Sequence, residues 1–119
     1  IRLSPALLDE AAKRLAVLYA QEGDLPTAYS WYRRAQTEAP TLSEKLALQE
    51  QMASFWSAQG IYLLAVDEYS RILAVARKPT YRAKILRLRG NAEAAGQNVD
   101  AAAADWRAAL QEAPHSREA

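Results

Sequence analysis

The side chains that could carry out chemistry are few and scattered in this chain of 119 residues. His115 is the single histidine and there are no cysteines, so the sequence excludes disulfides, thiolate zinc sites and cysteine nucleophiles. One histidine alone builds neither a metal site nor a catalytic triad. Carboxylates such as Glu10, Asp67 and Glu68 are spread along the chain and are interpreted as solvated surface charges. We therefore expect no catalytic residue, no metal and no cofactor, and a protein that is not an enzyme.

Charge is balanced along most of the chain, with 15 Lys and Arg residues against 14 Asp and Glu. This balance argues against nucleic acid as a partner, because a phosphate backbone requires a basic stripe. The one unbalanced run is RKPTYRAKILRLR at positions 77–89. Two interpretations stay open: a solvated helix face, or a patch that attracts an acidic partner and speeds association. The basic residues of this run are Arg77, Lys78, Arg82, Lys84, Arg87 and Arg89.

The aromatic residues could stack on sugars or bases, but most of them recur at helical spacing. That spacing predicts Tyr32, Trp56, Tyr69 and Trp106 as core residues. Two further aromatics, Trp31 and Tyr62, lie off these positions, and both packing and exposure stay open for them.

The sequence repeats itself at a fixed interval. Gly23 and Gly60 lie 37 residues apart, and in that register Tyr32 aligns with Tyr69. The last part of the chain aligns at twice this interval, so that Trp106 falls on Tyr32. Three copies of one unit therefore account for almost the whole chain.

Each unit is predicted to contain two helices. Ser4 and Pro5 form a helix start, and apolar residues then recur at three- and four-residue steps until Gly23 stops the helix. Asp24 begins the next helix, and Pro40 closes the unit. Thr41 and Glu44 have capping-box spacing, and the later helices are predicted at roughly 43–58, 61–76, 80–95 and 98–112. No segment has the alternation of a strand, so the predicted fold is all-α with six helices.

These features resemble the tetratricopeptide repeat. The residues that carry the resemblance in the first unit are Leu15, Ala16, Tyr19, Gly23, Asp24, Ala28, Tyr32, Ala35 and Pro40. The resemblance implies an α-solenoid, a right-handed superhelix of three antiparallel helix pairs in one domain. Its repeats would span about 4–40, 41–79 and 80–114, and residues 115–119 would start a truncated further repeat.

Three features depart from the family pattern. The interval of 37 exceeds the usual length of about 34 residues. Ile72 stands where the second unit would have an alanine. Gly96 comes one residue early in the third unit, which predicts an irregular turn there.

The resemblance also implies a concave surface formed by the first helix of each unit. Some family members hold the C-terminal carboxylates of a partner there with a Lys/Asn/Arg clamp. Lys13, Lys84 and Arg87 are suggestive of such a clamp, but Val17 occupies a position where it requires Asn. The full set of predicted partner-binding residues is Glu10, Lys13, Val17, Gln21, Glu50, Ser54, Ser57, Lys84, Arg87 and Asn91.

The expected function is a protein–protein interaction scaffold from the interior of a longer array, whose uncapped ends also allow self-association. The alanine- and arginine-rich style resembles periplasmic repeat regions of bacterial exopolysaccharide-export proteins of the Pel type. That resemblance implies a periplasmic location and a polysaccharide-modifying enzyme as the partner. One alternative is a cytoplasmic adaptor of the chaperone-docking kind. Another is direct polysaccharide binding through exposed Trp31 or Tyr62. No apolar run reaches the roughly 20 residues of a membrane span, so we expect no insertion by this segment.

Overall fold

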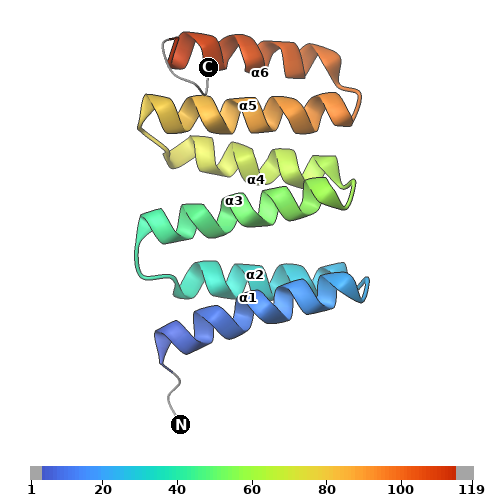
Figure 1. Cartoon of the computed structure of the whole chain (residues 1–119), viewed down its shortest axis with the longest axis vertical. Helices are drawn as coiled ribbons and strands as arrows, with labels where there is room; N and C mark the ends of the chain where they lie inside the picture. Colours follow the sequence, from blue (N-terminus) through green and yellow to red (C-terminus); the bar gives the residue numbers. More distant parts are fainter. Residues whose placement is uncertain (1–3, 115–119) are drawn as a thin grey trace. The chain divides into compact units, whose positions relative to one another are not determined.

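The computed structural model describes residues 4–114, and over this range the chain forms six α-helices and no strand (Figure 1). The all-α prediction is therefore confirmed, and the predicted helix limits agree within one residue from the third helix onward. The helices are α1 (Pro5–Gln21), α2 (Leu25–Glu38), α3 (Leu42–Ala58), α4 (Tyr62–Val75), α5 (Pro79–Ala95) and α6 (Val99–Glu112).

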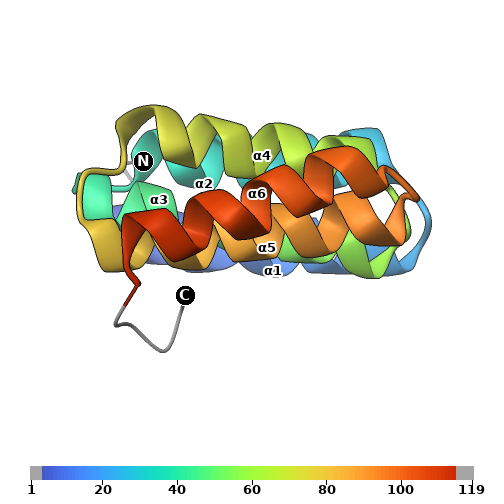
Figure 2. The ribbon, with the colours of Figure 1, turned by 90° about the horizontal axis from the view of Figure 1, so that it is seen from above.

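The chain divides into two compact units, one ending at Gln49 and the other beginning at Glu50, so the division falls within α3. In the first unit α1 packs against α2, and in the second α5 packs against both α4 and α6. Seen from above, α6 runs beside α5 in the opposite direction (Figure 2). The repeat boundaries near residues 40 and 79 stay predictions. The further repeat proposed for residues 115–119, together with His115, lies outside the described residues.

Side chains that accept a hydrogen bond from the first helical turn fix where several helices begin. Such caps satisfy backbone N–H groups that have no partner within the helix. The starts of α4 and α5, at Ile61 and Lys78, have no side-chain cap. The four caps are Ser4 Oγ to Leu7 N (3.1 Å), Asp24 Oδ1 to Thr27 N (3.3 Å), Thr41 Oγ1 to Glu44 N (3.1 Å) and Asn98 Oδ1 to Ala101 N (3.4 Å).

The turn inside each helical pair has the same backbone conformation. Gly23 and Gly60 have φ angles of 86° and 79°, and Gln97, a further 37 residues on, has a φ of 67°. In each turn this residue donates to the carbonyl three residues back, and the next residue donates to the carbonyl five residues back. This is the Schellman pattern that ends a helix at a left-handed residue. The expected irregular turn was therefore wrong. The early glycine, Gly96, takes a right-handed φ of −82°, and Gln97 adopts the glycine conformation.

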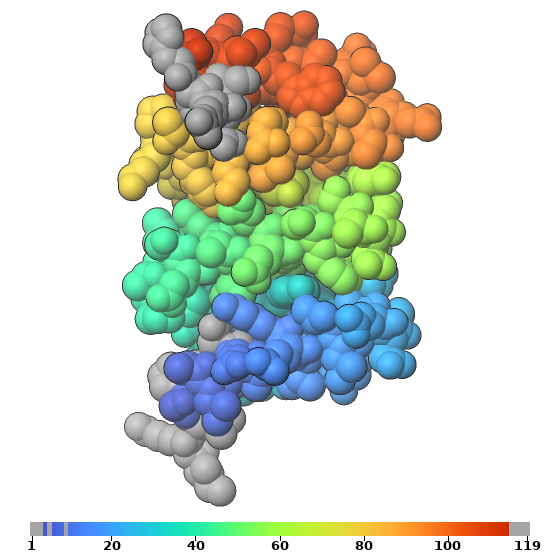
Figure 3. Space-filling view, in the orientation of Figure 1, coloured from blue at the N-terminus to red at the C-terminus, as the bar shows by residue number. Residues whose placement is uncertain are grey.

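Alanines allow α1 and α2 to approach closely, because a methyl group occupies little space between two helix backbones. Ala16 on α1 and Ala28 on α2 are both fully buried, and Tyr32 fills the volume beside them. Trp56 and Tyr69 are also buried, as the spacing predicted. In the second unit, a cluster of Ala83, Leu86, Ala109 and Ala113 joins α5 to α6, with Leu73 and Ala108 packed against it. On the right of the face in Figure 3, the orange surface of α5 adjoins the red-orange surface of α6.

One carboxylate prediction was wrong. Glu68 is only 1% exposed, although it was expected to be a solvated surface charge. It lies on the face of α4 that carries Ala65 and Ile72, three residues before and four after it, and both of these are fully buried. Asp67 and Glu10 are exposed, as expected.

None of the helices in the described part of the chain has the length and hydrophobicity to cross a membrane.

Candidate protein-binding surface

The predicted partner-binding residues of the first unit lie on α1 and are mostly exposed. Glu10 and Gln21 are exposed, and Val17 retains 43% of its accessible surface. Glu10 Oε1 accepts a hydrogen bond from Arg14 at 2.9 Å, within the same helix. Lys13 is half-buried. This part of the surface therefore offers polar groups and one exposed valine, and the Glu10 carboxylate is already paired with Arg14.

In the second unit, Glu50 on α3 is connected to two residues of α5. Lys84 Nζ lies 2.8 Å from Glu50 Oε1, and the Tyr81 hydroxyl lies 3.5 Å from Glu50 Oε2. Burial raises the pKa of Tyr81 to about 12, and the charge of Glu50 adds to the effect. Tyr81 therefore stays protonated and can act only as a neutral hydrogen-bonding group near neutral pH. We call Glu50, Tyr81 and Lys84 the α3–α5 group.

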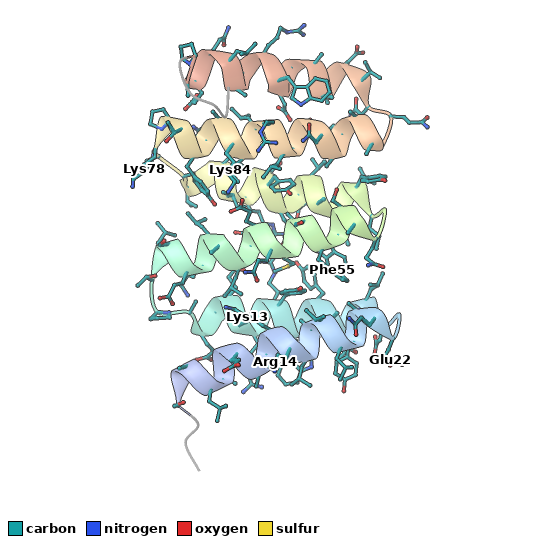
Figure 4. The ribbon with its side chains drawn as sticks, in the orientation of Figure 1. Lys13, Arg14, Glu22, Phe55, Lys78 and Lys84 are labelled. Carbon is teal, nitrogen blue, oxygen red and sulfur yellow. The ribbon has the colours of Figure 1, made fainter. Side chains whose placement is uncertain are left out.

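Lys84 and Arg87, which the sequence assigned to the partner-binding surface, are only partly exposed. Lys84 is half-buried, with 39% of its side chain accessible, and it points from α5 toward α3 (Figure 4). Arg87 is also half-buried, and its charge acts on the buried hydroxyl of Tyr69. Sequence alone could not predict this, because the pairing depends on which carboxylate the neighbouring helix presents.

The basic run at 77–89 is largely neutralised by carboxylates of the same unit. Besides Lys84, Arg82 Nε lies 2.7 Å from Glu112 Oε1. Arg89 meets Asp105 through two bonds of 2.7 Å each. Arg77 and Lys78 remain exposed in the link before α5, and Lys78 extends away from the helices (Figure 4). The run is therefore mainly structural rather than a single basic patch.

Trp106 was predicted as a core residue, and that prediction was wrong, because 42% of it is accessible. Its indole lies over Gly90 of α5, where an added Cβ would come within 2.5 Å of Trp106 Nε1. The same Nε1 donates to Asn91 Oδ1 at 3.2 Å, which fixes the orientation of the ring. Of the remaining predicted residues, Ser54 and Asn91 are exposed and Ser57 is half-buried.

Sequence reasoning missed an ionic group between α5 and α6 that consists of Arg89, Glu93 and Asp105. Burial acts to raise the pKa of Asp105, but its hydrogen bonds with Arg89 and Glu93 lower it below its usual value. Burial raises the pKa of Glu93 to about 7, and the neighbouring Asp105 adds to that increase. Two carboxyl groups so close favour one shared proton, held by Glu93. The signal in the sequence was that Arg89 and Asp105 replace Leu15 and Trp31 of the first unit at the repeat interval.

The aromatics that were left open are both half-buried. Trp31 packs against a cluster of Ala12, Ala35, Ala39 and Leu48. Tyr62 lines a pocket of about 430 Å³ between the start of α4 and the end of α5, where Glu93 also lies. Neither residue is the fully exposed aromatic that the polysaccharide alternative requires.

The residues that the structure describes contain no group of three or more His, Cys, Asp or Glu side chains placed to hold a metal ion.

Comparison with known proteins identifies the fold. No family model matches the chain, and no curated protein matches its sequence. Among solved structures, the N-terminal domain of stress-induced protein-1 (STI-1) from C. elegans is similar, with a TM-score of 0.68 and 17% sequence identity. The match covers 93% of this chain and 88% of that one. At this identity the likeness establishes the fold alone, and this chain has a tetratricopeptide-like helical fold.

Proposed function

We propose that the chain is a non-catalytic module that binds another protein through the exposed residues around the α3–α5 group. The supporting observation is that Glu50, Tyr81 and Lys84 bring a paired charge and a neutral phenol together across two helices. The tetratricopeptide-like fold agrees with a role in protein–protein interaction.

The paired state of Lys84 determines how a partner would bind. An acidic side chain of the partner would accept from Lys84, while Glu50 keeps its contact with Tyr81. This exchanges one ion pair for another, which contributes more to specificity and association rate than to affinity. Exposed Ser54, four residues after Glu50 on α3, offers a further hydrogen-bonding group. The surface therefore fits an extended segment with an acidic residue among polar and apolar neighbours.

Titration with synthetic peptides that differ only in their number of acidic residues tests this proposal. We expect Lys84→Gln to reduce the association rate for the acidic peptides by about threefold to tenfold at low salt, with a smaller effect at high salt, where exposed charges are screened. Because Lys84 is half-buried and its loss leaves Glu50 without its cation, thermal unfolding of the variant checks that the fold is retained.

Lys78→Gln is the matched control, because Lys78 carries the same charge on the same unit but extends away from the helices (Figure 4). Equal effects of the two variants would indicate nonspecific attraction and overturn the proposed surface. A Lys84→Gln variant that binds acidic peptides as the parent does would also overturn it.

A narrower proposal assigns the chain to a periplasmic scaffold for bacterial exopolysaccharide export, with a polymer-modifying enzyme as partner. Its support is the alanine- and arginine-rich sequence and the interval of 37 residues. Fractionation of cells that produce the protein tests the location. Recovery in the cytoplasm would favour the adaptor alternative instead.

The chaperone-docking alternative makes a separate prediction. A clamp formed by Lys13, Lys84 and Arg87 would bind a peptide with a free C-terminal carboxylate more tightly than the same peptide with a C-terminal amide. Val17 lacks the amide that such a clamp uses. We therefore expect no difference between the two peptides.

A further inference from the structure

The pocket between the start of α4 and the end of α5 has a volume of about 430 Å³. All of its lining residues fall between positions 60 and 98, inside the second compact unit. The turn before α4 and the turn after α5 lie at the same end of these helices (Figure 1). Pockets that hold small organic molecules have volumes of about 300–1,000 Å³. This pocket is therefore large enough for a small ligand.

Three positions around the pocket carry smaller side chains than the positions one repeat interval earlier. The pairs, each 37 residues apart, are Tyr29 with Val66, Phe55 with Ala92 and Gln59 with Gly96. A fourth position changes the other way, because Tyr62 stands 37 residues after Leu25. The three smaller side chains leave space at this place, and the ring of Tyr62 provides an aromatic wall for it.

Gly96 contributes to this space directly. A Cβ atom added there would lie 3.3 Å from Tyr62 Cβ and 3.5 Å from Tyr62 Cδ2. The φ angle of Gly96 is −82°, a conformation that any residue adopts, so the turn does not require glycine at this position. What the glycine provides is room beside the Tyr62 ring.

Glu93 gives the pocket its charged group. Among the described residues that line the pocket, it is the one with a carboxyl group, and none of them is basic. Glu93 Oε1 is shielded from solvent and has no hydrogen-bond donor within residues 4–114. The nearby Arg89 donates to Asp105 through two bonds of 2.7 Å and to Ser70 Oγ at 3.0 Å. The pocket therefore presents an acid without a cation of its own.

The groups around Glu93 favour a positively charged ligand. Asp105 of α6 already neutralises Arg89, so an anion in the pocket would face two carboxyl groups with little compensation. A cation would pair with Glu93 in a partly buried site, where charged hydrogen bonds are strong. The walls formed by Val66 and Ala92 are apolar and suit a hydrocarbon body.

We propose that this pocket binds a small organic cation, a protonated amine carried on an apolar aromatic body. The ammonium group would donate to the Glu93 carboxylate, and the apolar body would lie against Val66, Ala92 and the Tyr62 ring. The pocket shares no residue with the α3–α5 group. Failure of either proposal therefore leaves the other intact.

Three compounds with one phenylpropyl body test the role of charge: 3-phenylpropylamine, 3-phenylpropan-1-ol and 3-phenylpropionate. Each is titrated into the isotope-labelled protein at pH 8 while amide chemical shifts are recorded. We expect the amine to cause saturable changes at Ile61, Ala92 and Gly96, with a dissociation constant of about 1 mM or lower. The alcohol and the carboxylate should bind at least about tenfold more weakly, because neither donates a charged hydrogen bond.

Binding of the amine should also depend on pH. The pKa of Glu93 is about 7, so at pH 6 a proton must leave Glu93 before the ammonium group can pair with it. We expect about tenfold weaker binding at pH 6 than at pH 8, whereas the alcohol should bind equally at both. The amine stays protonated at both pH values, as a lysine side chain does.

The other groups near Glu93 do not account for this pH dependence. Asp105 and Arg89 keep their charges from pH 6 to pH 8, because the pKa of Asp105 is lowered and that of Arg89 is raised. Tyr62 of α4 is the other titratable side chain in the pocket lining. Glu93→Gln should reduce binding of the amine to the level of the alcohol and remove its pH dependence.

Val66→Tyr tests the space, because it introduces the residue that stands at position 29 and fills the pocket. We expect it to weaken binding of the amine by at least about tenfold. Val75→Tyr is the matched control, since Val75 is 43% exposed at the other end of α4 and does not line the pocket. Thermal unfolding checks that each variant remains folded. Gly96→Gln, which introduces the residue of position 59, replaces Val66→Tyr if that variant does not fold.

Four outcomes would overturn the proposal. The first is no saturable change with the amine at pH 8. The second is binding of 3-phenylpropionate as tight as that of the amine, which would mean that Glu93 does not select the ligand. The third is equal weakening by Val66→Tyr and Val75→Tyr, or none by either. The fourth is equally tight binding of N-acetyl-lysine amide, which would mean that charge alone, without the aromatic body, accounts for the association.

Discussion

Between α1 and α2 the interior consists of alanines and aromatic rings, whereas between α5 and α6 an arginine bridges to an aspartate. Leu15, Tyr19 and Trp31 of the first pair correspond to Arg89, Glu93 and Asp105 of the third. Both pairs have the same Schellman turn, with the left-handed residue at Gly23 in one and at Gln97 in the other. Alanine contacts and turn geometry therefore define the helical pair, while the remaining interior positions accept either kind of chemistry.

The two kinds of interior differ in what a single substitution does. Removing one partner of a buried ion pair leaves a charge without compensation, whereas removing both partners together is much less costly. An apolar interior has no such dependence between two residues beyond their packing. The third pair is therefore the more vulnerable to single changes and the more sensitive to pH.

The largest effect is expected for Asp105→Ala, which leaves Arg89 half-buried without its carboxylate. We expect a loss of about 2–4 kcal/mol in the free energy of unfolding, measured by urea denaturation. Arg89→Leu combined with Asp105→Ala should lose less, because the double variant approaches the apolar first pair. A double variant that is less stable than Asp105→Ala alone would contradict the view that the two interiors are interchangeable.

The alanine contacts should respond alike in the two pairs. Ala28 and Ala102 lie 74 residues apart and are 0% and 1% exposed. Substitution of either by Leu should overpack the helix contact and cost roughly 1–3 kcal/mol. Ala104→Leu on the exposed side of α6 is the control and should leave the melting temperature nearly unchanged. Parent-like stability of Ala28→Leu would show that the repeat register is misassigned.

A smaller effect is expected at the third turn. Gln97 has a left-handed φ of 67°. This conformation is strained for any residue with a Cβ atom but not for glycine. Gln97→Gly should therefore stabilise the protein by about 0.5–1 kcal/mol, as measured by thermal or urea unfolding. Gly60→Gln should have the opposite effect, because Gly60 has the same conformation at a φ of 79°. Effects of the same sign in both variants would disprove the equivalence of the turns.

The smallest effect concerns Glu93 and depends on pH. Its pKa is about 7 in the folded protein against an ordinary value of 4.5, so folding takes up a proton between these values. The contribution of Glu93 to the free energy of unfolding is complete below pH 4.5 and is lost as the pH rises through 7. Arg89 from α5 and Asp105 from α6 are the charged groups that act on it. Because the pKa of Asp105 is lowered, the stability that its charge contributes is complete above pH 3.8 and is lost only as the pH falls below that value.

Glu93→Gln tests this effect, because the amide can donate to Asp105 as the protonated acid does and cannot ionise. We expect the variant to exceed the parent in stability above pH 7 and to match it near pH 4.5. Urea denaturation at both pH values measures this difference. Glu38→Gln, on the exposed part of α2, is the matched control, and an equal pH response of the two variants would contradict the role of Glu93.

Helix positions were predictable because they depend on local features. Caps such as Thr41 and turn glycines such as Gly23 and Gly60 act through neighbouring backbone groups, so their effect appears in the sequence itself. The third turn was misjudged, because the early Gly96 suggested that the turn had moved. The third turn instead has the same backbone geometry as the first two, and Gln97 adopts the left-handed conformation that Gly23 and Gly60 have in theirs.

The candidate surface was less predictable because burial depends on neighbouring helices. Trp106 stands at the position of Tyr32 and Tyr69, but its exposure is set by whether a helix covers α6. The sequence placed Lys84 correctly within a helix, which is α5, but its pairing with Glu50 could not be predicted. Glu68 was misassigned, because its polarity was weighed above its place three residues after Ala65. The three predicted repeats hold Trp31, Glu68 and Asp105 at this position. Comparing them would have indicated an interior site.

The distribution of tryptophan gives each helical pair its own optical reporter. Trp31 in the first pair is half-buried, Trp56 in the second is 1% exposed, and Trp106 in the third is 42% exposed. These three indoles are the only tryptophans in the sequence, so single-tryptophan variants would each emit from one known pair. Emission wavelength and collisional quenching should then rank Trp106, Trp31 and Trp56 from most to least accessible. A denaturant scan of the three variants would reveal whether the pairs melt together or one after another.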